Sequence, residues 1–213
     1  TGVNWAWKRA RGYFDMVAYT GTGSARTVAH NLGVAPEMMW IKNRDDTDDW
    51  NVYYGDNTDY LVLNETNVTA DNVNRWNDTS PTSSVFTVGT HNDVNTSSEN
   101  YIAMLFATVS GVSKIGTYTG NGSSQTIDCG FTNGSKFVLI KRINDSGHWQ
   151  VWDTERGLVA GNDTRISLNN TSASLTGYDM IDPDDSGFAV PTSNDTNENT
   201  KTYLFYAIAN DPS

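Results

Sequence analysis

Short apolar runs separated by polar turns extend along the whole chain. The runs are rich in Val, Ile, Tyr, Phe, Trp and Thr, and the segments between them are rich in Gly, Asn, Asp and Ser. These are the signals of strands and turns, and no segment shows a convincing helical period. The sequence therefore predicts an all-β protein. In the first half, strands are expected near residues 14–20, 26–30, 37–43, 49–54, 59–64, 84–89 and 100–108.

The pattern of the first half recurs in the second. The stretch YTGTGSARTVAHNLG at 19–33 is followed by YTGNGSSQTIDCGFT at 118–132, an offset of 99 residues (118 − 19). Residues 36–54 match residues 135–153 at the same offset without a gap, and later strands match after extra residues enter one loop. Insertions confined to loops between matched apolar runs are what duplication of a folded unit leaves behind.

Each copy is expected to form an antiparallel β-sandwich or jelly roll, because it offers six or seven short strands separated by turns. The two tandem repeats either pack closely as two units or interleave their strands in one larger sandwich, and we favour two units. The predicted boundaries are 1–13 for an N-terminal arm or the end of a preceding segment, 14–110 for the first repeat and 111–213 for the second.

The two glycine-rich stretches, TGTG and TGNG, resemble nucleotide-binding loops at first sight. A phosphate-binding loop needs a following helix, whose amide groups and dipole meet the anion. Here SARTV and SSQTI continue as strand. We therefore interpret each stretch as a hairpin turn, in which Gly and Asn adopt positive φ cheaply.

Composition and charge narrow the classes of function. With 14 Lys and Arg against 25 Asp and Glu, the formal charge of −11 repels nucleic acid and anionic membranes. The single cysteine, Cys129, excludes an internal disulfide, and no apolar run reaches the length of a membrane helix. We expect a soluble protein made in a reducing cytosol. Because it begins at Thr1, we expect it to be processed or cut from a longer chain.

Two aromatic residues are candidates for ligand or subunit contact. In WNVYY at 50–54 and WQVWD at 149–153, side chains alternate between the two faces of a strand. The Trp-x-Val face is the expected core. Tyr53 and Trp152 then lie on the outer face, where exposed aromatics can stack on sugar rings or pack against another subunit. Simple packing is the competing interpretation.

The N-terminal segment WAWKRARGYFD, residues 5–15, combines basic and aromatic residues and has no counterpart in the second half. It can dock on an acidic neighbouring subunit, or it can be the last strand of a preceding domain. The candidate interface residues are Trp5, Trp7, Lys8, Arg9 and Arg11.

Carboxylates cluster in two loops, RDDTDDW at 44–50 and DMIDPDDSG at 179–187, and such loops can hold Ca²⁺. The candidate ligands are Asp45, Asp46, Asp48, Asp182, Asp184 and Asp185. Neither loop has EF-hand spacing, so solvated acidic turns are the simpler interpretation and no cofactor is predicted.

The sequence offers no convincing catalytic arrangement. The three histidines form no metal pattern, and no serine lies in a nucleophile elbow. Asp153 and Glu155 have the residue types of a glycosidase pair, and an extended DTE segment would place both on one face about 7 Å apart. No companion motif accompanies them, and we predict that the protein is not an enzyme.

The pattern GYFDMVAYTGTGSARTVAHNLG, continued by PEMMWIKNRDDTDDWNVYY, resembles a module recurrent in structural proteins of tailed bacteriophages, notably marine and cyanobacterial phages. HNLG stands at residues 30–33, and WD-x-x-RG of the second copy stands at residues 152–157. The likeness covers nearly the whole chain.

The resemblance implies a virion structural protein, of tail-fibre, tail-associated or capsid-decoration type. Such a protein would be made in the cytoplasm of the bacterial host and would project from the virion surface. It would form a homo-oligomer, contact other virion proteins and contribute to host attachment. The alternatives are a concanavalin-like carbohydrate-binding module that holds a host-surface glycan, and a glycan depolymerase.

Overall fold

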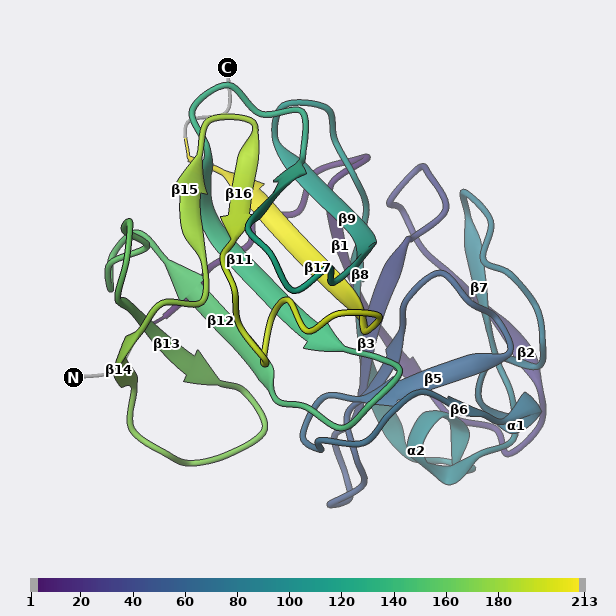
Figure 1. Ribbon diagram of the computed structural model, residues 1–213. Helices are drawn as coiled ribbons and strands as arrows, with labels where there is room; N and C mark the ends of the chain where they lie inside the picture. Colours follow the sequence, from purple (N-terminus) through teal and green to yellow (C-terminus); the bar gives the residue numbers. More distant parts are fainter. Residues whose placement is uncertain (1–3, 211–213) are drawn as a thin grey trace. The chain divides into compact units, whose positions relative to one another are not determined.

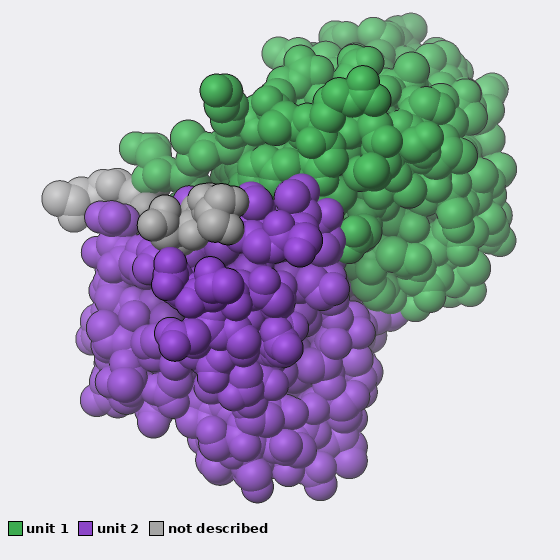
Figure 2. Space-filling model, turned by 90° about the horizontal axis from the view of Figure 1, so that it is seen from above, with its two compact units in different colours: residues 1–60, 71–107 green, residues 61–70, 108–213 purple. Residues whose placement is uncertain are grey.

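The computed structural model describes residues 4–210, and it confirms an all-β fold built from antiparallel sheets (Figure 1). The chain forms two compact units (Figure 2). Unit 1 comprises residues 1–60 and 71–107, and unit 2 comprises residues 61–70 and 108–213. Residues 61–70 therefore belong with unit 2, although they lie within the first half of the sequence.

Unit 1 is built on a two-stranded sheet and on a six-stranded sheet, of which Leu61, Val62 and Ala70 fall among the residues of unit 2. The six strands follow the order β1 (Phe14–Thr20), β8 (Asn100–Phe106), β3 (Met38–Asn43), β4 (Asn51–Tyr53), β5 (Asp59–Val62) and β6 (Ala70–Asp71). The small sheet pairs β2 (Arg26–Ala29) with β7 (Val85–Val88). All seven strands predicted in the first half are present, with ends within two residues of the prediction.

Two single-turn helices, α1 (Val73–Trp76) and α2 (Asn92–Asn95), correct the expectation of no helix. The Asn72 side chain caps α1, and the His91 side chain caps α2. A helix of four residues shows no periodic pattern, so only its capping residues mark it in the sequence. Within residues 4–210, neither helix is long and apolar enough to cross a membrane.

Unit 2 combines a six-stranded sheet with a three-stranded one. The large sheet follows the order β9 (Ser113–Thr119), β17 (Thr202–Ala209), β11 (Ser135–Arg142), β12 (Trp149–Asp153), β13 (Asp163–Ser167) and β14 (Leu175–Tyr178). The small sheet follows the order β10 (Gln125–Asp128), β16 (Gly187–Val190) and β15 (Asp182–Asp184). In both units the first strand of the large sheet pairs with the last strand in chain order, as β1 pairs with β8 and β9 with β17.

The core of each unit lies between its large and small sheets, and this position corrects the prediction for Tyr53 and Trp152. Tyr53 is 4% exposed and packs edge-on against Trp76, at 5.8 Å between ring centroids. Trp152 is fully buried in a cluster that includes Phe188 of the small sheet and Phe205. The small sheets cover the face that we had expected to be open, so neither residue is exposed for stacking on a sugar.

The opposite face of each large sheet is also buried. In unit 1, Val52 is fully buried, and Trp40 and Phe106 contact the ring of Trp7 at centroid distances of 6.4 and 6.0 Å. In unit 2, Val151 is fully buried on this face. Because these strands are buried on both faces, the order of polar and apolar residues in the sequence does not tell which face is exposed to solvent.

The TGTG stretch is not a hairpin, which corrects the sequence interpretation. It carries the chain from β1 in the large sheet to β2 in the small sheet, and the two strands do not pair with each other. A Cβ atom on Gly21 would lie 2.0 Å from the Thr96 carbonyl oxygen, and Gly23 has a φ of +71°. Glycine is therefore required here by a close backbone approach and by positive φ.

A fully buried asparagine holds this crossing. The Asn95 side chain accepts a hydrogen bond from Thr22 N at 2.9 Å and donates to the carbonyls of Ser24 and Gly89, each at 2.7 Å. In unit 2, fully buried Asn197 accepts from Asn121 N at 3.0 Å and donates to Ser123 O at 2.6 Å. We call Asn95 and Asn197 the crossing asparagines.

Asn197→Ala should lower the free energy of unfolding by about 2–4 kcal/mol, because the substitution leaves several buried backbone groups without a partner. Urea denaturation followed by tryptophan fluorescence measures the change. Asn199→Ala, which removes an exposed amide of the same unit, is the matched control and should stay within about 0.5 kcal/mol of the unmodified protein. Equal losses in the two variants would contradict the role assigned to Asn197.

Candidate functional site

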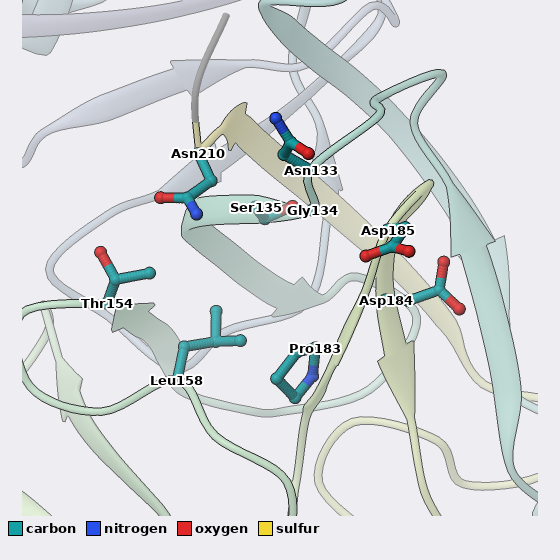
Figure 3. Close-up of a pocket in the computed structure, with 9 residues that line it drawn as sticks. All are labelled: Asn133, Gly134, Ser135, Thr154, Leu158, Pro183, Asp184, Asp185 and Asn210. Carbon is teal, nitrogen blue, oxygen red and sulfur yellow. The ribbon is translucent and has the colours of Figure 1, made fainter.

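Unit 2 contains a cavity of about 360 Å³ at the end of its sheets (Figure 3). Figure 3 shows Leu158 and Pro183 next to each other on one side of the cavity. The polar residues around the rest of it are Asn133, Ser135, Thr154, Asp184, Asp185 and Asn210. The cavity thus joins a small apolar floor to a larger polar rim, so its lining is more polar than that of most small-molecule sites, which are lined mainly by apolar side chains.

Backbone hydrogen bonds fix the rim. Gly134 N donates to Asp185 O at 2.9 Å, and Asn210 N donates to Gly134 O at 2.9 Å. Gly134 has a φ of +70°, and a Cβ there would lie 2.9 Å from Asp184 O. The loop before β11, the turn between β15 and β16 and the end of β17 are therefore held together at the cavity.

The loop that carries Leu158 is fixed by carboxylates. The backbone N–H of Val159 donates to Asp163 Oδ1 at 3.2 Å, and that of Gly161 donates to Asp182 Oδ1 at 3.0 Å. Burial raises the pKa of Asp163 to about 6, although hydrogen bonds from Ile181 N, Val159 N and Met180 N act in the opposite direction. These bonds hold the apolar floor without help from a ligand.

Three predicted calcium ligands of the second half lie at or beside the cavity. Asp184 and Asp185 line it, whereas Asp182 fastens the neighbouring loop. Asp184 accepts hydrogen bonds from Ser186 Oγ at 2.6 Å, from Ser186 N at 2.9 Å and from Thr126 Oγ1 at 3.1 Å, and these bonds hold its pKa below the usual value. Among residues 4–210, no group of three or more His, Cys, Asp and Glu side chains is placed to hold a metal ion.

The acidic residues of the first half bind groups of their own loop and of the strands beside it. Asp45 Oδ2 accepts from Asn100 N at 2.8 Å, Asp46 Oδ1 accepts from Thr47 N at 2.6 Å and Asp48 Oδ2 accepts from Asn43 Nδ2 at 2.7 Å. Their oxygens thus stabilise the turn between β3 and β4 and join it to the start of β8. The interpretation as acidic turns accounts for this loop better than a calcium site does.

The N-terminal candidates divide into two groups. Trp7 belongs to the aromatic cluster of unit 1, and Arg9 pairs with Asp15 at 2.5 Å. Lys8 and Arg11 are exposed, and Trp5 is half-buried. Arg9 and Arg11 also line a smaller cavity of about 170 Å³ in unit 1.

Asp15 anchors this basic segment. Although burial alone would raise the pKa of Asp15, hydrogen bonds from Asn31 N and Arg9 hold it below the ordinary value. The carboxylate therefore stays charged at neutral pH, and Arg9 is engaged within unit 1. Of the three predicted basic residues, Lys8 and Arg11 are exposed and form no ion pair with any residue between 4 and 210.

Asp153 and Glu155, the two carboxylates considered and set aside as a glycosidase pair, are not assembled as one. Asp153 ends β12, is 4% exposed and pairs with Arg156 at 2.5 Å. Glu155 is exposed and lies in the turn that follows, so the extended geometry assumed for DTE is wrong. Asp153 stabilises this turn, because its Oδ1 also accepts a hydrogen bond from Arg156 N at 2.9 Å.

Cys129 and Lys141 are further buried groups with shifted pKa values, which often mark functional sites. Burial raises the pKa of the Cys129 thiol to about 12, so it is a poor nucleophile at neutral pH. Burial, together with the nearby charge of Arg142, lowers the pKa of Lys141 to about 8. Lys141 Nζ donates to Thr66 O at 3.1 Å and to Gly147 O at 2.8 Å, and so fastens residues 61–70 to the rest of unit 2.

Comparison with protein families gives one match. A family model described as a domain of unknown function, DUF7483, matches residues 3–212. The chain belongs to the DUF7483 family. No curated protein and no solved structure matches it.

Sequence reasoning identified part of the DUF7483 cavity. It singled out Asp184 and Asp185, but it missed Asn133, Thr154 and Asn210. These three polar residues come from separate loops, and each is surrounded by many residues of the same types. The only local signal was Gly134, whose position between two polar residues before a strand is typical of a turn with positive φ.

Because burial disfavours the charged form of Lys141, the free energy of unfolding should depend on pH. The folded protein loses this proton near pH 8 and the unfolded chain near pH 10.4, so the contribution of Lys141 to stability rises with pH between these values. From pH 7 to pH 9, the free energy of unfolding should rise by about 1 kcal/mol relative to Lys141→Met. Guanidinium denaturation at both pH values tests this, with the exposed Lys136→Met as control. A pH dependence that is unchanged in Lys141→Met would contradict the assignment.

Proposed function

We propose that this DUF7483 protein is a structural component of the surface of a tailed-bacteriophage particle, of tail-fibre, tail-associated or capsid-decoration type. In this role it is made in the bacterial host cytoplasm, forms a homo-oligomer, binds other virion proteins and contributes to host attachment. It acts by presenting fixed surfaces and not by catalysis. The motifs from residue 12 to residue 54, and their counterparts in the second half, support the proposal through their resemblance to phage structural modules.

The observation that carries the proposal is the use of buried polar groups to brace loops. Asn95, Asn197, Asp15 and Asp163 are each no more than 2% exposed, and each binds backbone N–H groups of a connecting segment. A buried polar side chain that is fully hydrogen-bonded makes its surroundings rigid. Rigid loops on a two-unit β scaffold suit a protein that must keep its shape on the outside of a particle.

The alternative functions differ in their support. Carbohydrate binding is favoured by the cavity in unit 2, although not by Tyr53 and Trp152, which are buried. A glycan depolymerase would need two catalytic carboxylates. Asp153 and Glu155 do not provide them, because Asp153 forms an ion pair with Arg156 and Glu155 lies outside the strand. The structural role and glycan binding are compatible with each other, since host attachment requires a surface that recognises the cell.

Purified particles test the structural role directly. Virions of the phage that encodes the chain are separated on a density gradient, and tryptic peptides from residues 4–210 are quantified in each fraction. We expect the peptides to sediment with the major capsid protein and to remain after a high-salt wash, and gold-labelled antibodies against the chain should bind intact particles. A phage-encoded cytosolic enzyme serves as the control. Recovery of the chain only in the soluble fraction, together with that enzyme, would overturn the proposal.

A further inference from the structure

The cavity of unit 2 has the size of a site for one small ring. Its volume of about 360 Å³ lies near the lower end of ligand pockets, which range from about 300 to 1,000 Å³. Leu158 and Pro183 form an apolar patch on one side, and the polar rim lies around the rest (Figure 3). A ligand that fits this cavity must therefore be compact, with one apolar side and a polar circumference.

The rim groups favour a ligand that carries several hydroxyls. The amides of Asn133 and Asn210 can each donate and accept hydrogen bonds, as can the hydroxyl of Thr154, whereas the carboxylate of Asp185 can only accept. A hydroxyl donates and accepts at once, so one ring with several hydroxyls can satisfy all four side chains. The C–H face of a pyranose ring can cover Leu158 and Pro183 at the same time.

The charge of the rim excludes acidic ligands. Asp184 and Asp185 both line the cavity, and its lining includes no Lys or Arg. A carboxylate or phosphate placed among these groups would meet like charge without compensation, which is costly in a recess. The hydrogen bonds from Ser186 and Thr126 that lower the pKa of Asp184 keep it ionised at neutral pH.

The cavity is also preorganised. Its floor residue Leu158 is fixed by a hydrogen bond from its own N–H to Asp153 O at 3.1 Å, and Thr154 by one from its N–H to Lys136 O at 3.1 Å. Ser135 Oγ donates to Gly187 O at 2.8 Å beneath the rim. Preformed walls reduce the entropy lost on binding, which matters most for weak ligands such as single sugars.

From these observations we infer that the cavity of unit 2 binds a neutral hexopyranose unit of a cell-surface glycan and rejects acidic sugars. The hydroxyl-bearing edge of the ring faces Asn133, Thr154, Asp185 and Asn210, and its C–H face packs on Leu158 and Pro183. This inference deepens the attachment part of the proposed function. It makes the second unit the one that contacts the host.

Saturation-transfer difference NMR on the full chain tests the inference. The probes are the methyl α-glycosides of D-glucose, D-mannose and D-galactose, with sodium D-glucuronate as the acidic probe. We expect saturation transfer to at least one neutral glycoside, with a dissociation constant in the millimolar range, and none to glucuronate. Addition of EDTA should leave the signal unchanged, because the rim residues and not a metal ion hold the sugar. Transfer to none of the three glycosides, or to glucuronate alone, would overturn the inference.

Matched variants locate the site. Asn133→Ala combined with Thr154→Ala should weaken binding at least about tenfold, because two rim partners of the sugar are lost. Asn199→Ala combined with Thr171→Ala removes the same two residue types from exposed positions of unit 2 and should bind as the unmodified chain does. Equal binding by the two double variants would place the sugar elsewhere and refute the site.

A charge variant tests the selectivity separately. Asp185 is exposed, so Asp185→Lys should fold, and it should gain saturation transfer to glucuronate. A variant that still excludes glucuronate would refute the account of selectivity. Failure of sugar binding leaves the structural role intact, because that role is decided by the presence of the chain in purified particles. Absence from particles, in turn, leaves the NMR result standing as a property of the isolated chain.

Discussion

Both units depend on a buried carboxamide at the point where the chain crosses from the large sheet to the small one. The crossing needs several backbone N–H and C=O groups to leave the sheet ladders, and such groups are costly when they are buried without partners. Asn95 and Asn197 supply both donors and acceptors at this point, and both are fully buried. Because the crossing fixes the small sheet over the large one, the position of the core follows from it.

The same crossing is supported by stacked tyrosines. Tyr19 stacks on Tyr101 in unit 1 with ring centroids 5.2 Å apart, and Tyr118 stacks on Tyr203 in unit 2 at 5.0 Å. The hydroxyl of Tyr19 donates to Val94 O at 2.7 Å, and that of Tyr118 donates to Thr196 O at 2.5 Å, each next to a crossing asparagine. A buried aromatic pair with satisfied hydroxyls adds apolar contact without leaving polar groups unpaired.

The strands could be predicted from sequence, but the exposure of their faces could not. The segment from Asn51 to Tyr53 alternates correctly, yet every residue in it is buried, including Asn51, whose amide donates to Asp93 at 3.1 Å. Alternation identifies residues that share a face, whereas exposure depends on what covers that face. The prediction that the glycine-rich stretches are hairpins was wrong for a similar reason. Positive φ occurs both in hairpins and in crossings between sheets, and only the pairing of the strands tells them apart.

Four rim residues of the candidate site, Asn133, Thr154, Asp185 and Asn210, lie in loops outside the matched strands, so the pattern of the strands did not identify them. At the offset of 99 residues that aligns the two halves, Asn133 and Thr154 stand where the first half has Val34 and Gly55. Those positions flank the same large-sheet strands, but their side chains cannot form an equivalent polar rim. A scaffold held by buried groups permits such changes in its loops without loss of the fold. The polar rim of the unit 2 cavity can therefore differ from the matching loops of the first half while the strands that carry those loops stay matched.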